Sequence, residues 1–129
     1  MSRINIKRKN ISIFLQGGLG NQLFQIFTTI SYALTHNYNY IFEYSDKLKI
    51  GEIRPTYWNN FLKNIKKNTT KDKLEYIEYS EKFFSYNKIP KFKENTMLSG
   101  FFQSEKYFKD NYNKIINILK IKEFKKKFK

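Results

Sequence analysis

Cysteine is absent from the 129 residues of the chain. Its absence excludes disulfides, thiolate metal sites and a cysteine nucleophile. Histidine occurs once, at His36, and a single histidine by itself forms neither a Ser–His–Asp triad nor a multi-histidine metal site. Long apolar runs are also missing, because Thr, Ser and Gln interrupt every apolar window well short of about 20 residues. We therefore expect no transmembrane helix.

Acidic residues are scarce, since 11 Asp and Glu stand against 25 Lys and Arg and the net charge is +14. Such a charge suits a basic module that binds nucleic acid or another polyanion with a steep dependence on salt. The lysines are spread along the chain, however, as on an ordinary solvated surface. Asn, Ile, Tyr and Phe are also abundant, which indicates A/T-rich codons. We favour a lysine-rich surface without a specific nucleic-acid partner, and the polyanion-binding module is the alternative.

The first residues are basic, but no apolar core of signal-peptide length and no small-residue cleavage site follow them. We therefore expect no signal peptide, no membrane anchor and no secretion. A basic surface attracts an acidic membrane weakly, so the expected location is the cytoplasm or the periphery of a membrane.

Glycine is rare, and three of the five glycines, Gly17, Gly18 and Gly20, fall in one short stretch. An apolar run precedes the stretch at residues 11–15, and a helical repeat of apolar residues begins at Asn21. The order is therefore strand, glycine loop, helix. Such a loop turns sharply and presents N–H groups at a helix N-terminus, where an anion such as a phosphate is favoured. Asn21 is expected to cap the helix or to face a ligand.

This loop differs from the two common nucleotide-binding loops. A P-loop has Gly-Lys-Ser/Thr before its helix, whereas Gly20 is followed by Asn21 and Gln22. The dinucleotide fingerprint needs a third glycine at the position that Leu23 occupies. On the loop alone, a tight turn without a ligand therefore remains an alternative.

The surrounding pattern predicts a fold class. Hydrophobic residues make up 40% of the chain and aromatic residues 19%, so a folded domain is expected. A helix over residues 21–36 and a second strand at 40–43 complete a βαβ unit with parallel strands. We predict an α/β fold with a Rossmann-like parallel sheet. Glu43 and Asp46 follow the second strand, where a Rossmann unit carries its ribose-binding acid, or they are exposed acids at a strand end.

The remainder of the chain predicts two further helices and two further strands. The first helix follows Pro55, and its apolar face places Trp58 in the core; this face comprises Trp58, Phe61, Leu62 and Ile65. Strands are expected at residues 74–79, where a helical turn is the alternative, and at 96–102. The last helix opens at Ser104, and residues 120–129 form a basic tail.

Two segments resemble one known family. The stretch Gly-Gly-Leu-Gly-Asn-Gln-Leu-Phe-Gln at residues 17–25 resembles the N-terminal signature of the α-1,2-fucosyltransferases, glycosyltransferase family 11. Residues 98–108 carry Gly-Phe-Phe-Gln-Ser followed by Lys-Tyr-Phe, which resembles a second segment of the same family. The two segments occur in the family's order and spacing.

The resemblance implies a fold, a reaction and site residues. Members are expected to have a two-domain GT-B-type fold and to transfer fucose from GDP-fucose to a galactoside 2-hydroxyl with inversion, without a metal or other cofactor. The donor-facing residues would be Gly17, Gly18, Gly20, Asn21 and Gln22, and Gln103 and Ser104 would lie at the edge of the cleft. No general base is identified by the resemblance. Asp46 and Glu43 are candidates by their chemistry alone.

The resemblance covers the N-terminal part of the family's catalytic domain. The family's His-x-Arg-Arg-x-Asp motif has no counterpart, because the only histidine is followed by Asn37 and Tyr38. We therefore expect residues 1–129 to form the N-terminal Rossmann-like half, without the donor-binding C-terminal half, and to be inactive or weakly active alone. A separate chain that supplies the missing half is an expected partner, beside the nucleotide sugar and the galactoside.

Overall fold

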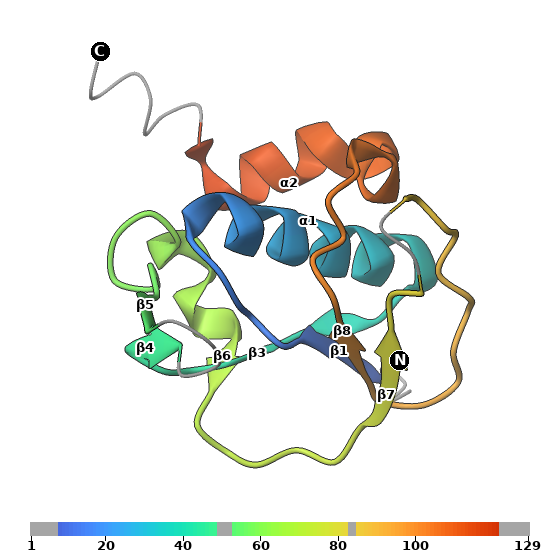
Figure 1. The fold of residues 1–129 in the computed structure, drawn as a ribbon, viewed down its shortest axis with the longest axis horizontal. Coiled ribbons are helices and arrows are strands. Elements are labelled where there is room, and N and C mark those ends of the chain that lie inside the picture. The colour runs from blue at the N-terminus through green and yellow to red at the C-terminus, as the bar shows by residue number, and fades with distance from the viewer. Residues whose placement is uncertain (1–7, 49–52, 83–84, 122–129) are drawn as a thin grey trace, which may run out of the picture.

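The computed structural model describes residues 8–48, 53–82 and 85–121. Its centre is a four-stranded sheet in the order β2-β1-β8-β7 (Figure 1). The strands are β1 (Asn10–Ile13), β2 (Asn39–Tyr40), β7 (Ile77–Ser80) and β8 (Thr96–Ser99). All three neighbouring pairs are parallel. The prediction of an α/β fold with a parallel sheet is confirmed.

Helix α1 (Leu19–His36) follows β1 and packs against it. The helix begins earlier than predicted, because the N–H of Gln22 already donates to the carbonyl of Gly18 at 3.0 Å. The N-cap position is occupied by Gly18, so no side chain caps the helix. The expectation that Asn21 caps this helix is therefore wrong. The helix ends as predicted, where Asn37 adopts a left-handed conformation with φ 61° and donates its N–H to Ala33.

The predicted strand at residues 40–43 is divided between two sheets. Its first part, β2, pairs with β1 in parallel, as the βαβ unit requires. Its second part, β3 (Phe42–Glu43), pairs in parallel with β6 (Thr69–Thr70). The fully buried ring of Phe42 lies 5.5 Å from the ring of Trp58, and this contact holds β3 against the segment that follows residue 56.

The helix predicted after Pro55 does not form. Strand β5 (Arg54–Pro55) pairs instead with β4 (Lys47–Leu48), antiparallel, and the next regular element is the 3₁₀ helix η1 (Lys63–Asn68). A residue before proline is biased toward extended backbone, and the Thr56 hydroxyl donates to the carbonyl of Asp46 at 3.0 Å. Both features favour the pairing of Arg54 and Pro55 with β4 over a helix. The predicted burial of Trp58 is confirmed, because 1% of it is exposed.

The C-terminal third keeps its predicted strands but not its continuous helix. Strand β7 overlaps the end of the predicted region, residues 74–79, and continues one residue past it to Ser80. Strand β8 ends before Gly100, whose φ of +140° leaves the strand conformation. The predicted last helix is divided into η2 (Glu105–Tyr107), η3 (Lys109–Asn111) and α2 (Tyr112–Leu119). The predicted basic tail lies outside the described residues from position 122 onward.

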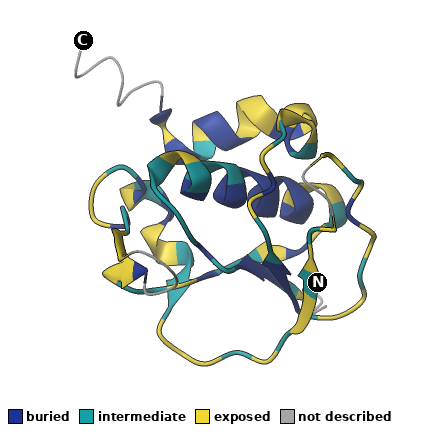
Figure 2. Cartoon of the chain, viewed as in Figure 1, coloured by how far each residue is buried: buried dark blue, intermediate teal, exposed yellow. Residues whose placement is uncertain are grey.

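Helix α1 lies between the sheet and α2 (Figure 1), and the buried residues concentrate between these layers (Figure 2). The largest fully buried side chains join the sheet, α1, α2 and the segment of residues 58–65 into one core; they include Ile11, Ile13, Ile26, Ile30, Trp58, Leu62, Ile65, Leu98, Phe102 and Ile115. Within the described ranges, no helix is long and apolar enough to cross a membrane.

Burial of tyrosines predicts a loss of stability in alkali. Burial raises the pKa of Tyr32, Tyr76 and Tyr107 from 10.0 to about 12. Above pH 10 the unfolded chain loses these protons while the folded chain keeps them, so unfolding releases protons and the free energy of unfolding falls as the pH rises toward 12. Urea unfolding midpoints at about pH 9 and about pH 11 measure the loss.

A control uses Tyr76, whose hydroxyl is buried and has no hydrogen-bond partner among the described residues. Tyr76→Phe removes one of the tyrosines whose pKa is raised by burial, so we expect it to reduce the alkaline loss of stability. Equal urea midpoints at both pH values in the parent protein would contradict the expectation.

Candidate functional site

Three loops meet where the parallel strands end. Because β1 and β8 run in the same direction, the loops that follow them, residues 16–18 and 100–103, lie at the same edge of the sheet. The third segment, counted with these loops, is the two-residue strand β5 (Arg54–Pro55). Ligands of open parallel sheets bind at this carboxyl edge. Amide side chains from the first two turns of α1 contact all three loops.

Gln22 contacts two of the loops from inside the protein. It is fully buried, and its Nε2 donates to the carbonyls of Gly17 and Pro55, each at 3.0 Å. Its Oε1 is buried without a hydrogen-bond partner among the described residues. In this structure Gln22 therefore positions the glycine loop from behind, and its predicted contact with a donor stays a prediction.

Gln25 contacts the loops that follow β1 and β8, and it was not predicted as a site residue. Its Oε1 accepts from the N–H of Gln16 and its Nε2 donates to the carbonyl of Gly100, both at 3.1 Å. Gln25 is fully buried. The sequence signal that could have identified Gln25 is its position: it is a polar residue in the middle of an apolar helical face, three positions after Gln22.

Asn21 and Gln103 lie side by side at the same edge. The Nε2 of Gln103 donates to the Oδ1 of Asn21, in a short hydrogen bond between residues 82 positions apart. Gln103 is exposed and Asn21 is half-buried. The two segments that were singled out in the sequence are therefore in direct contact, and both amides are accessible from the edge of the sheet.

The glycines differ in what surrounds them. Gly17 has φ +83°, and a Cβ there would lie 2.9 Å from Asn21 Cβ. A Cβ on Gly18 would lie 3.7 Å from a guanidinium nitrogen of Arg54, whereas Gly20 has nothing within 4 Å. Arg54, which the sequence did not indicate, thus brings a positive charge beside the N-terminus of α1. The charge of Arg54 and the N-terminus of α1 both favour an anion at this loop.

The candidate acids lie on the neighbouring element. Glu43, at the end of β3, lines a cavity of about 320 Å³ together with Phe14, Leu15 and Leu48. Asp46 does not line this cavity, and its Oδ1 accepts from the Tyr44 hydroxyl at 3.2 Å. The structure therefore places Glu43, and not Asp46, against a cavity at the end of β1.

Ser104 and Glu81 shape the loop after β8. The Ser104 hydroxyl accepts from the N–H of Lys106 and caps η2, so its contact in this structure is local. Glu81, which follows β7, was not predicted as a site residue. Its carboxylate accepts from the N–H of Phe102 at 3.0 Å and from the Tyr107 hydroxyl at 3.1 Å. Glu81 thereby fixes the backbone that carries Gln103.

Within the part of the chain that the structure describes, no three His, Asp or Glu side chains gather in a group that would hold a metal ion. Comparison of the chain with models of protein families, with curated proteins and with solved structures finds no match. The function is therefore inferred from the residues and their geometry.

Proposed function

We propose that the chain is a glycosyltransferase-like protein of the α-1,2-fucosyltransferase class, and that its sheet is the Rossmann-like, N-terminal half of a GT-B-type fold. In this proposal the reaction transfers fucose from GDP-fucose to a galactoside 2-hydroxyl with inversion. The observation that supports it most is the contact between Asn21 and Gln103. It joins the two segments that resemble the family, at the edge of the sheet where ligands bind.

The proposed donor site uses the open side of the glycine loop. The N–H groups of Gly18 and Gly20 lie at the N-terminus of α1, where orphan donors and the helix dipole favour a phosphate. Arg54 supplies a positive charge beside Gly18. When GDP leaves, negative charge develops on its phosphates, and donors already in place stabilise that charge most. Asn21 donates from the same turn, while Gln22 and Gln25 hold the loop in position.

The proposed base is Glu43, because it lines the cavity at the end of β1. Inversion requires a group that takes the proton of the acceptor hydroxyl as its oxygen attacks the anomeric carbon and GDP departs. Asp46 is the second candidate. The chain alone is expected to transfer fucose weakly or not at all, because transfer depends on holding donor and acceptor together.

Donor binding is measured by amide chemical shifts of the ¹⁵N-labelled protein, which resolve weak binding residue by residue. We expect GDP-fucose and GDP to shift the amides of Gly18, Gly20 and Asn21 in a saturable way. Asn21→Ala should weaken the affinity about tenfold, because a hydrogen bond to a charged group is lost. Asn113→Ala, on the exposed side of α2, is the matched control and should leave the affinity unchanged.

Two outcomes would contradict the proposal. If UDP-galactose shifts the same amides as strongly as GDP-fucose, the fold proposal stands and the donor is wrong. If single-stranded RNA binds at about 50 mM salt, shifts amides across many lysines and dissociates steeply as salt rises, the polyanion-binding alternative is correct.

A further inference from the structure

A second cavity lies away from the glycine loop, on the C-terminal half of α1. Its volume is about 140 Å³, against about 30 Å³ for one water molecule. Three segments line it: α1, the stretch around residues 86–89, and the stretch from η2 to η3. None of the residues that form the three loops at the sheet edge lines it. The cavity is therefore separate from the proposed donor site.

One wall of this cavity carries a buried hydroxyl without a partner. Thr28 is 0% exposed, and its Oγ1 has no hydrogen-bond partner among the described residues. The next residue, Thr29, satisfies its own hydroxyl by donating to the carbonyl of Gln25 at 2.8 Å. Thr28 therefore differs from its neighbour, because it lines the cavity and leaves a buried hydroxyl without a partner, whereas buried polar groups are normally satisfied.

The charges around the cavity favour an anion. Lys88 and Lys106 line it from two different segments, and Asp110 is the only acidic residue in the lining. Neither lysine forms an ion pair with another residue in the described ranges. Burial, together with the charges of Lys91 and Lys88, lowers the pKa of His36, so near neutral pH its imidazole is uncharged and one ring nitrogen is available as a donor.

The walls are held by contacts that do not use these groups. The Nδ2 of Asn111 donates to the Ser31 Oγ at 2.8 Å and to the Thr35 Oγ1 at 2.9 Å. The Tyr107 hydroxyl donates to Glu81, and its ring lies 4.8 Å from that of Tyr86. The cavity is therefore shaped before any ligand arrives, and its lysines and Thr28 remain available.

We propose that this cavity binds a small oxyanion, either free phosphate or the phosphate group of a phosphomonoester. Lys88 and Lys106 supply the positive charges from two different segments, while Thr28 and His36 donate hydrogen bonds from α1. Asp110 disfavours a second anionic group next to the first. The site therefore takes one phosphate group and excludes extended polyanions.

The test titrates the ¹⁵N-labelled protein with inorganic phosphate and, separately, with glucose 6-phosphate. We expect saturable shifts at Thr28, His36 and Asn111. Lys88→Gln and Lys106→Gln should each weaken binding about tenfold. Thr28→Val, which removes the hydroxyl and keeps the shape of the side chain, should weaken binding several-fold. Lys114→Gln removes an exposed lysine of α2 that does not line the cavity, and it should have no effect.

Tighter binding of glucose 6-phosphate than of phosphate would assign the site to a phosphomonoester, and the reverse would assign it to free phosphate. An affinity that is unaltered by Lys88→Gln and Lys106→Gln would overturn the proposal. It would also be overturned if Lys114→Gln weakened binding as much as they do, or if no saturable shift occurred at Thr28. These variants leave the glycine loop intact, so their results are independent of the donor experiment.

Discussion

Gly17→Ala is expected to lower the free energy of unfolding by about 2–5 kcal/mol, whereas Gly20→Ala is expected to raise it by up to about 1 kcal/mol. Gly17 has φ +83°, a conformation that costs an alanine about 1–2 kcal/mol. The new methyl group would also overlap the side chain of Asn21, and overpacking of this kind costs about 1–3 kcal/mol. Urea unfolding of the purified variants measures both changes.

Gly20 is the matched control, because it lies three positions away in the same motif. It is part of the helical first turn of α1, it is exposed, and no atom lies within 4 Å of an added Cβ. Alanine favours a helix over glycine. If Gly17→Ala were as stable as the parent protein, that result would contradict the positive φ of Gly17 and the packing of Asn21 against it.

Phe102→Ala is expected to destabilise the fold by about 3–5 kcal/mol, as other buried aromatic residues do when they are truncated. The ring of Phe102 is 0% exposed and lies 5.1 Å from the ring of Tyr107. The total stability of a small domain is about 5–15 kcal/mol, so this loss is a large fraction of it and lowers the unfolding temperature. Thermal unfolding followed by circular dichroism measures it.

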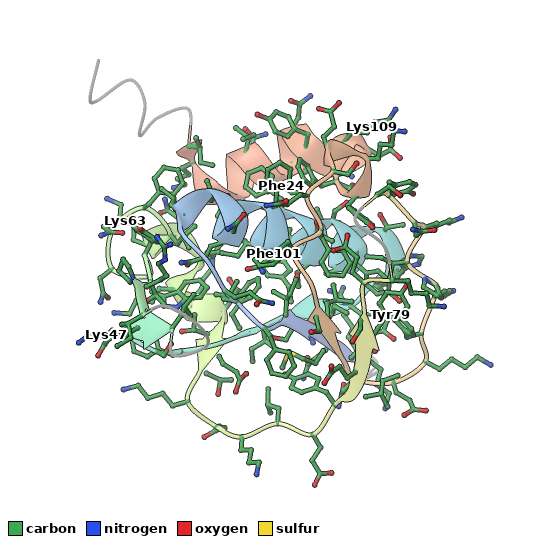
Figure 3. All side chains as sticks on the ribbon, in the orientation of Figure 1. Phe24, Lys47, Lys63, Tyr79, Phe101 and Lys109 are labelled. Carbon is green, nitrogen blue, oxygen red and sulfur yellow. The ribbon has the colours of Figure 1, made fainter. Side chains whose placement is uncertain are left out.

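The neighbouring Phe101 distinguishes this effect from a general loss of aromatic surface. Phe101 is 37% exposed and lies on the segment that connects β8 to η2 (Figure 3). Phe101→Ala should change stability by no more than about 0.5 kcal/mol. Similar losses for the two variants would show that the chain after Gly100 follows another path.

The parts of the fold that the sequence predicted are those with strong local signals. The apolar run of β1, the glycine loop and the long repeat of α1 together specify strand, turn and helix, and the structure has all three. The helix expected after Pro55 failed for a physical reason. Turns and a 3₁₀ helix, like an α-helix, can bring Trp58, Leu62 and Ile65 to one side of the chain. The apolar spacing therefore predicted the burial of these residues correctly, but it predicted an α-helix that does not form.

The candidate site shows the same limit. The glycines and Asn21 could be identified because the motif itself contains them. Gln25 also belongs to the motif, but its contact could not be predicted, and Glu81 and Arg54 could not be identified at all, because their contacts are made with segments far away in the chain. The bond from Gln25 to Gly100 spans 75 positions, and that from Phe102 to Glu81 spans 21. Only the folded sheet brings these partners together.

The strand order has a consequence for how the chain folds during synthesis. Strand β1 pairs on one side with β8. The N–H of Asn10 donates to the side-chain Oδ1 of Asn95, which lies 85 positions further along the chain. Contacts so distant in sequence form slowly, because the long intervening loop must close before they are gained. On the ribosome, β1 and α1 therefore emerge early and keep apolar faces uncovered until β8 has been made. This interval is when the nascent protein is most exposed to aggregation, and it is when a chaperone would bind.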